Sequence, residues 1–164
     1  MRLRPVLLLL ALHSVPVLAQ PSVPDTLERR VAACTSCHGS PSAPPPASTG
    51  PDYYPRIAGK PAGYLYNQLQ NFRAGRRQYP LMTYMVEHMS DDYLHEIATW
   101  FSTQHVPAPV LARGSLPAGQ MERGRELVLR GDAALKVPAC VSCHGQRLTG
   151  ALPAIPGLLG LPRD

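Results

Sequence analysis

Cys34-Thr35-Ser36-Cys37-His38 recurs as Cys140-Val141-Ser142-Cys143-His144, and these two pentapeptides hold all four cysteines of the chain. Cys-x-x-Cys-His is the attachment signature for c-type haem. Two thiols three positions apart can form thioethers with the two vinyl groups on one edge of a porphyrin, and the adjacent histidine can ligate the iron. We therefore expect two haem c groups, held covalently by the four cysteines, with His38 and His144 as axial ligands.

Three other uses of paired cysteines fit the sequence less well. A thioredoxin-like redox motif opens a helix after a strand in a βαβ context, which this sequence lacks. A structural zinc site would have to join two pairs that are 106 residues apart, and the histidine after both pairs would be accidental. Simple disulfides also need no histidine at these positions. The duplicated pentapeptide therefore favours haem.

The N-terminus has the pattern of an export signal. Arg2 and Arg4 precede an apolar stretch at 6–12, and Val17-Leu18-Ala19 offers small residues where a signal peptidase reads. The apolar run is too short to cross ~30 Å of hydrocarbon. We expect a signal peptide over 1–19 and a mature protein in the periplasm with no stable membrane span. A retained N-terminal anchor is the alternative.

Composition excludes several classes of protein. The chain has 164 residues, of which 19 are proline and 16% are charged. Proline at more than twice the average usage of ~5% argues against a long helical bundle or a coiled coil. The net charge of +5 falls to +3 once the two arginines of the signal are removed, which leaves 14 basic and 11 acidic side chains. No basic run predicts a nucleic-acid partner.

The internal repeat extends beyond the cysteines. Residues 55–61 and 156–162 share a Pro-x-aliphatic-x-Gly-x-Pro frame, which begins 17 residues after the first motif histidine and 12 after the second. A duplicated haem module explains this pattern. We expect a first cytochrome c domain over 20–105, a proline-rich linker over 106–117 and a second domain over 118–164.

Helix signals recur along the first of these domains. Asp25 and Glu28 resemble the capping box of a short helix that leads into Cys34. Pro61 suits the first turn of a second helix, which ends near Gly75.

Ser90 is a good N-cap for a third helix that extends to about Gln104. Its expected buried stripe, spaced i, i+3, i+4 and i+7, consists of Leu94, Ile97, Ala98 and Phe101. A further helix is expected at 121–130. No segment alternates with period two for long enough to be a strand, so we expect an all-α fold.

The sixth iron ligand separates electron transfer from catalysis, because a filled coordination sphere leaves no room for substrate. Met82, Met85 and Met89 are candidates, whereas Met121 lies beyond the linker. Pro80 argues against a regular helix at Met82. We therefore expect Met82 to be the ligand, with Met85 and Met89 as packing residues.

Five segments of the first domain resemble cytochrome c4, a family of periplasmic dihaem class I cytochromes c with two similar domains. They lie at 54–59, 64–69, 72–77, 82–85 and 94–101. The resemblance covers the whole first domain and continues into the second. It implies the class I cytochrome c fold in two tandem haem modules. It also implies an axial role for Met82, the first methionine of the Met-Thr-x-Met segment.

Neighbours of the haem histidines are also predicted. A ligating histidine usually donates its other ring N–H to a backbone carbonyl. Gly50-Pro51-Asp52 resembles the Gly-Pro-Asn of many class I cytochromes c, so we expect the Pro51 carbonyl to accept from His38. Pro153 is a weaker candidate for the same role toward His144.

Three arginines are candidates to pair with haem propionates, because guanidinium matches carboxylate geometry. They are Arg56, Arg76 and Arg77, for which a solvated basic face is an equally good explanation. Four propionates would bring the mature net charge to roughly −1, so steering of partners by net charge should be modest.

The second domain departs from the family pattern. Pro162 matches Pro61, but only two residues follow it, and no Met or His lies after His144. Counterparts of residues 62–104 are therefore missing. We expect a C-terminally truncated second domain whose haem is five-coordinate, water-ligated or poorly incorporated. Such a haem would otherwise rest against the first domain or a partner chain.

These features predict single-electron transfer and no enzymatic activity. The resemblance implies a place between a membrane-bound quinol-oxidising complex and a terminal oxidase. An alternative is the cytochrome subunit of a periplasmic dehydrogenase or flavocytochrome, which looks similar in sequence. A small haem peroxidase or ligand sensor, using an open second haem, is a less favoured alternative.

Overall fold

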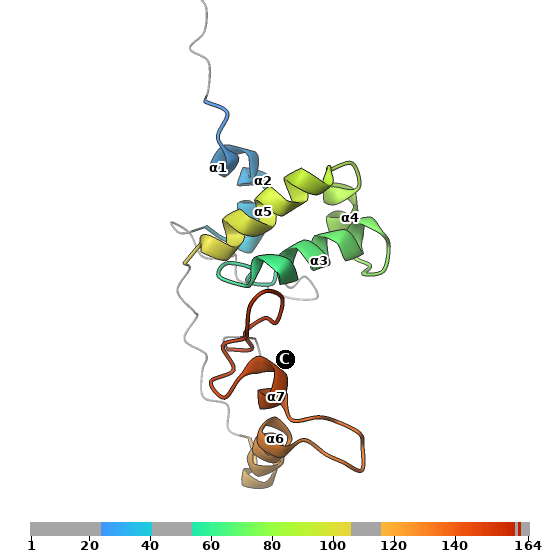
Figure 1. The fold of residues 1–164 in the computed structure, drawn as a ribbon, viewed down its shortest axis with the longest axis vertical. Coiled ribbons are helices and arrows are strands. Elements are labelled where there is room, and N and C mark those ends of the chain that lie inside the picture. Colours follow the sequence, from blue (N-terminus) through green and yellow to red (C-terminus); the bar gives the residue numbers. More distant parts are fainter. Residues whose placement is uncertain (1–23, 41–53, 106–115, 160, 162–164) are drawn as a thin grey trace, which may run out of the picture.

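The computed structural model describes residues 24–40, 54–105, 116–159 and 161. These residues form seven α-helices (Figure 1). Within them, β-structure is limited to isolated bridges such as those that join Asp132 to Val137 and Ala151 to Ile155. The all-α expectation is thus confirmed. The predicted signal peptide and most of the predicted linker lie outside the described residues.

Two short helices carry the first Cys-x-x-Cys-His motif. They are α1 (Leu27–Arg30) and α2 (Ala32–His38). The side chain of Thr26 caps α1 by accepting a hydrogen bond from the Arg29 backbone N–H at 3.4 Å. The capping box predicted to begin at Asp25 is therefore wrong by one residue, because the cap is the residue with extended backbone dihedrals immediately before the helix.

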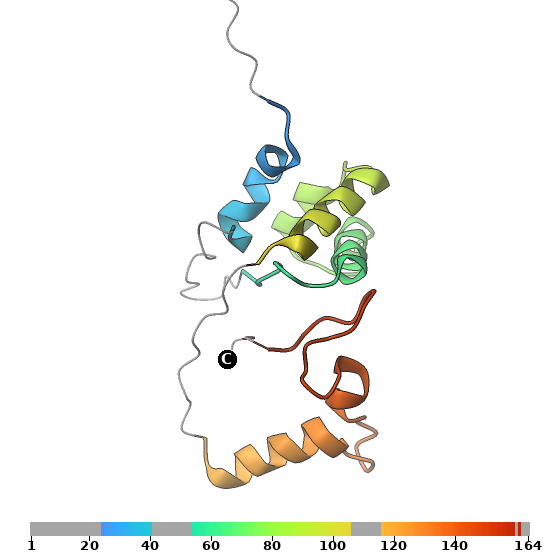
Figure 2. The same cartoon turned by 60° about the vertical axis from the view of Figure 1, so that its left-hand side comes forward.

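Three more helices, two of them longer, complete the N-terminal part of the structure, which comprises α1–α5. Helices α3 (Ala62–Arg73) and α5 (Asp91–Thr103) pack side by side, and α4 (Pro80–Val86) lies across one end of the pair (Figures 1 and 2). Ser90 caps α5 as predicted, because its hydroxyl accepts from the Tyr93 backbone N–H at 3.3 Å.

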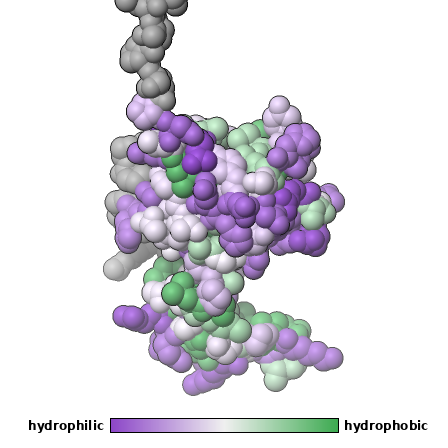
Figure 3. Space-filling model, turned by 45° about the horizontal axis from the view of Figure 1, so that its top comes forward, coloured by the Kyte–Doolittle hydropathy of each residue, from purple (hydrophilic) through white to green (hydrophobic). Residues whose placement is uncertain are grey.

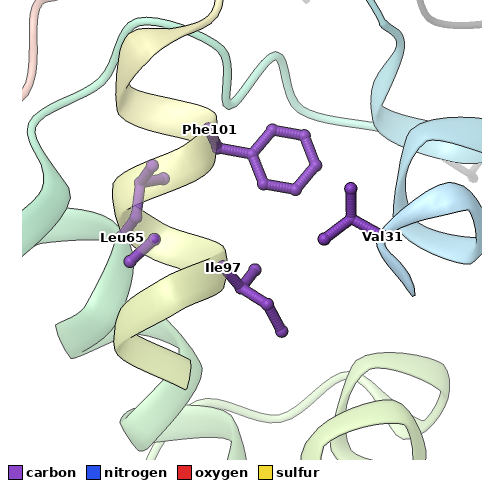
Figure 4. Packing of buried hydrophobic residues seen from close by; sticks show 5 residues of the cluster. Val31, Leu65, Ile97 and Phe101 are labelled. Carbon is purple, nitrogen blue, oxygen red and sulfur yellow. The ribbon is translucent and has the colours of Figure 1, made fainter. Parts of the chain in front are cut away.

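The core joins the motif helices to α3 and α5. Val31, between α1 and α2, is fully buried and packs with Leu65, Ile97 and Phe101 (Figure 4). Leu94 is also fully buried, in a second cluster with side chains from α3 and α4. The predicted stripe on α5 is confirmed, since all four of its residues are buried.

The start of α4 corrects one prediction. Pro80 occupies the first turn of this helix, and Met82 and Met85 both lie within it. Proline is tolerated there because it lacks only an N–H that would have no partner in the helix. The expectation that Pro80 would prevent a regular helix at Met82 is wrong.

The C-terminal part contains α6 (Ala118–Arg130) and α7 (Cys140–His144). A loop follows each of these helices, and each loop contains a tightly packed glycine with positive φ, Gly131 at 74° directly after α6 and Gly150 at 85° in the segment after α7. A Cβ at Gly131 would lie 2.3 Å from the Val137 carbonyl oxygen, and one at Gly150 would be 2.4 Å from a carbonyl oxygen. Only glycine allows these loops to close so tightly.

Apolar surface is concentrated on the C-terminal part. Neither α6 nor α7 has a buried residue, and large apolar side chains such as Leu135, Leu152 and Leu159 are more than half exposed. Figure 3 shows green, apolar surface gathered on the lower part of the molecule, together with hydrophilic residues. Among the described residues, no helix has the length and apolarity needed to span a membrane.

Candidate haem sites

A cavity of about 550 Å³ opens in the N-terminal part, among α2, α3, α4 and α5. This volume lies within the range of about 300–1,000 Å³ typical of ligand pockets. Its lining includes Cys34, Cys37 and His38 from the first motif, and most of the remaining lining is apolar or aromatic. A large flat apolar group with a metal at its centre suits such a lining.

The geometry of His38 is that of a ligand held in place. Its side chain is buried, and Nδ1 lies 2.8 Å from the Pro55 carbonyl oxygen. A carbonyl can only accept, so Nδ1 carries the proton and Nε2 keeps its lone pair. Burial lowers the pKa of His38, with a smaller contribution from Arg77, against the opposing effect of the Pro55 carbonyl. A neutral imidazole is the form that binds iron.

The second motif repeats this arrangement. His144 lies at the end of α7, and its Nδ1 is 2.7 Å from the Pro156 carbonyl oxygen. Pro156 is 12 residues after His144, and Pro55 is 17 residues after His38. The two prolines begin the two copies of the Pro-x-aliphatic-x-Gly-x-Pro frame. The repeated frame therefore supplies the carbonyl that orients each histidine.

These contacts correct the predicted acceptors. His38 donates to Pro55, and Pro51 lies outside the described residues. Pro153 does not serve His144, because His144 Nδ1 bonds to the Pro156 carbonyl, and the Pro153 carbonyl accepts from the backbone N–H of Gly63. The signal for the true acceptors was already present in the sequence as the first proline of the repeated frame.

The thiols are placed for attachment. Cys34 and Cys37 lie one helical turn apart on α2, so they share one face, which lines the cavity. Burial raises the pKa of the Cys34 thiol. Cys140 and Cys143 have the same spacing on α7 and are free thiols as well. Within the described residues, the four cysteines do not converge on one metal site.

The candidate sixth ligands gather at the first cavity. Met82, Met85 and Met89 all line it. Met89 also packs against both clusters of buried residues. The choice of Met82 over Met85 stays a prediction, since both side chains reach the cavity. Met121 lies on α6 and is 57% exposed.

One of the three predicted arginines reaches the cavity lining. Arg77 lies there with its guanidinium 4.7 Å from the ring centroid of Phe72, and it donates to the Gln68 side chain at 2.7 Å. Arg76 is exposed and donates to Asn71 at 2.8 Å. Neither Arg76 nor Arg56 is among the described residues that line the cavity. Sequence reasoning missed Lys60, a cavity residue inside the first copy of the repeated frame.

Comparison of the sequence with known proteins identifies relatives of this chain. The "thiosulfate dehydrogenase electron acceptor" of Thiomonas intermedia is 35% identical over 133 residues, which cover 79% of this chain and 57% of that protein. Cytochrome c4 of Azotobacter vinelandii is 30% identical over 134 residues, which cover 76% and 59%. The chain thus spans little more than half the length of these relatives. No family model matches it.

A solved structure agrees with the sequence relatives. Reduced recombinant cytochrome c4 from Pseudomonas stutzeri superposes with a TM-score of 0.61 and 30% sequence identity. The match covers 80% of this chain and 69% of that one. The match therefore covers more of the chain than either of the two predicted domains alone.

Proposed function

Because the chain belongs to the cytochrome c4 family, we propose that it is a dihaem electron carrier. The observation that carries this proposal is the N-terminal cavity, which gathers two thiols, one oriented histidine and three methionines on a single apolar lining. The residues fit a covalently bound haem with a thioether as sixth ligand. Cys34 and Cys37 would hold the first haem, and Cys140 and Cys143 the second, with His38 and His144 as axial ligands.

Haem would supply an iron that takes up and releases one electron. The chain's own residues then set the conditions for that exchange. The Pro55 carbonyl fixes the ring of His38, and a methionine of α4, where Met82 and Met85 both line the cavity, would supply the sixth ligand to the iron. We propose Met82 as the ligand of the first haem. A protein side chain in the sixth position would leave no place for a substrate on the first iron, which supports electron transfer at that haem.

We further propose that the protein works in the periplasm. The export pattern at 1–19 supports this location, and covalent attachment prevents loss of a cofactor that is hard to replace outside the cytoplasm. The proposed haem domains span 20–105 and 118–164.

Two sets of redox partners are consistent with the proposal. As a respiratory carrier, the protein would take electrons from a membrane-bound quinol-oxidising complex and pass them to a terminal oxidase. As the acceptor of a periplasmic dehydrogenase, it would be reduced by that enzyme. The name of the Thiomonas intermedia relative supports the second candidate, with thiosulfate dehydrogenase as the partner to test first.

Stopped-flow mixing of the oxidised protein with each donor distinguishes these candidates. A carrier of either kind should be reduced reversibly, one electron per haem, with no turnover of hydrogen peroxide. Rapid reduction by a thiosulfate dehydrogenase with thiosulfate, and slow reduction by a quinol-oxidising complex, would assign the dehydrogenase. The converse pattern would assign the respiratory chain. Peroxide turnover at a rate typical of peroxidases would overturn electron transfer as the function.

A further inference from the structure

The N-terminal and C-terminal parts meet at two hydrogen bonds. The backbone N–H of Gly63 donates to the Pro153 carbonyl at 3.1 Å, and the Lys60 ammonium donates to the Gly157 carbonyl at 3.4 Å. Figure 2 shows the loop after α7 reaching up to the start of α3. Both contacts join the segment that begins α3 to the loop that follows the second motif.

At Gly63, the backbones of the N-terminal and C-terminal parts come close together. The N–H of Gly63 lies in the first turn of α3 and so has no partner inside the helix, and no side chain caps this helix. The Pro153 carbonyl fills that role. A Cβ on Gly63 would lie 2.7 Å from the Pro153 oxygen, which is closer than real Cβ contacts. The absence of a side chain at this position therefore allows the two parts to touch.

Besides its contact with Gly157, Lys60 also lies at the N-terminal cavity. It lines the N-terminal cavity and is only partly exposed. Burial lowers the pKa of Lys60, and the nearby charge of Arg56 lowers it further. Among the described residues no carboxylate forms an ion pair with Lys60, and the cavity lining contains Lys60 and Arg77 but no acidic side chain. The cavity is thus positively charged and suits a ligand that carries carboxylates.

We propose that Lys60 binds a propionate of the first haem and the Gly157 carbonyl with the same ammonium group, and so couples the first haem to the C-terminal part. An ammonium has three donors, and the Gly157 contact uses one of them. Gly157 directly follows Pro156, whose carbonyl orients His144. Lys60 is therefore a positioning residue that connects the first cavity to the backbone holding the second histidine. This inference rests on the proposed function, because it requires haem in the first cavity.

The test compares Lys60→Leu with Lys136→Leu in the complete haem-loaded protein. Lys136 is the chain's other lysine and lies exposed in the loop between α6 and α7, so its substitution removes the same charge without touching the Lys60–Gly157 contact. A cation beside a haem favours the reduced state. Lys60→Leu should therefore make the first haem roughly tenfold harder to reduce, equivalent to about 59 mV in its midpoint potential for a one-electron couple. Lys60→Arg keeps the positive charge, so its midpoint potential should stay close to that of the wild-type protein.

Hydrogen exchange at Gly63 supplies a readout that does not depend on electron transfer. If Lys60 holds the C-terminal loop in place, Lys60→Leu should speed exchange of the Gly63 amide by roughly tenfold, because its bond to Pro153 then opens more often. Gly63→Ala should loosen the same contact through a steric clash while leaving the first midpoint potential nearly unchanged. This second variant separates the mechanical contact from the charge of Lys60.

The outcomes distinguish this inference from the proposed function. Wild-type protein without covalent haem would refute the proposed function itself. If the wild-type protein carries two haems but Lys60→Leu and Lys136→Leu have equal midpoint potentials, only the role of Lys60 is overturned. A lowered potential in Lys60→Leu with unchanged exchange at Gly63 would refute the coupling to the C-terminal part.

Discussion

Replacing Leu94 by alanine should unfold the protein at a much lower denaturant concentration. Leu94 is fully buried on α5 and belongs to the cluster that also contains Phe72 and Val86. The three methionines that line the cavity pack against the same cluster. The substitution therefore removes the support beneath the helix that carries the proposed sixth ligand.

The size of the effect follows from the burial. Leu→Ala removes about three carbon groups, which corresponds to about 2.4 kcal/mol of lost transfer free energy at about 0.8 kcal/mol per buried CH₂. The cavity left behind adds to this loss, so the free energy of unfolding should fall by about 3–5 kcal/mol. With a urea m-value of about 2 kcal/mol/M, the midpoint should move down by about 1.5–2.5 M.

Urea unfolding of the haem-loaded protein, followed by far-UV circular dichroism, measures this shift. Leu135→Ala is the matched control, because the Leu135 side chain is 67% exposed and its loss should change the free energy of unfolding by less than about 0.5 kcal/mol. The far-red absorption band of thioether ligation should also disappear at lower urea in Leu94→Ala. Equal midpoints for Leu94→Ala and Leu135→Ala would show that this packing does not support α4.

Three further predictions test other parts of the structure. Met82→Ala should abolish the far-red band of the ferric protein and Met85→Ala should keep it; a band lost only in Met85→Ala would assign the ligand to Met85. The hydrogen bond from the Arg73 side chain lowers the pKa of Asp91 in the folded protein. The stability contributed by this ionised carboxylate is therefore fully present above the ordinary Asp pKa of about 3.9, and it is lost as the pH falls through the lower pKa of the folded state. Asp91→Asn should accordingly reduce the urea midpoint at pH 6 but not at pH 2, and an equal reduction at both values would contradict the ion pair. Gly131→Ala should destabilise the loop between α6 and α7 by about 1–3 kcal/mol, because the new Cβ would lie 2.3 Å from a backbone carbonyl; unchanged hydrogen exchange in that loop would refute this.

Local sequence patterns were sufficient to predict several of the helices. The spacing of the apolar residues on α5 and the cap at Ser90 depend only on residues within one helix, and both predictions are confirmed. The same holds for α6, expected at 121–130 and observed over Ala118–Arg130. Pro80 shows the limit of such reasoning, because the effect of a proline depends on which turn of the helix it occupies.

Contacts between distant residues were harder to predict. The carbonyl that accepts from His38 lies 17 residues further along the chain. Patterns within one helix do not show which carbonyl will meet the histidine ring. The repeated frame contained the answer, since Pro55 and Pro156 occupy its first position in both copies. Lys60 gave no such signal, because Leu161 takes the matching place in the second copy. Its position between the cavity and the C-terminal loop emerges only once the chain is folded.

The central claim is that both Cys-x-x-Cys-His motifs hold haem covalently. Intact-mass spectrometry of the exported protein, combined with acid–acetone extraction, tests it most directly. The account predicts a mass increase of two haems that acid–acetone does not remove. Cys37→Ala should leave a single thioether at the first haem and shift its pyridine haemochrome spectrum, while the second haem is unchanged. Haem that acid–acetone extracts completely, or a protein of unmodified mass that carries stoichiometric zinc, would contradict the account.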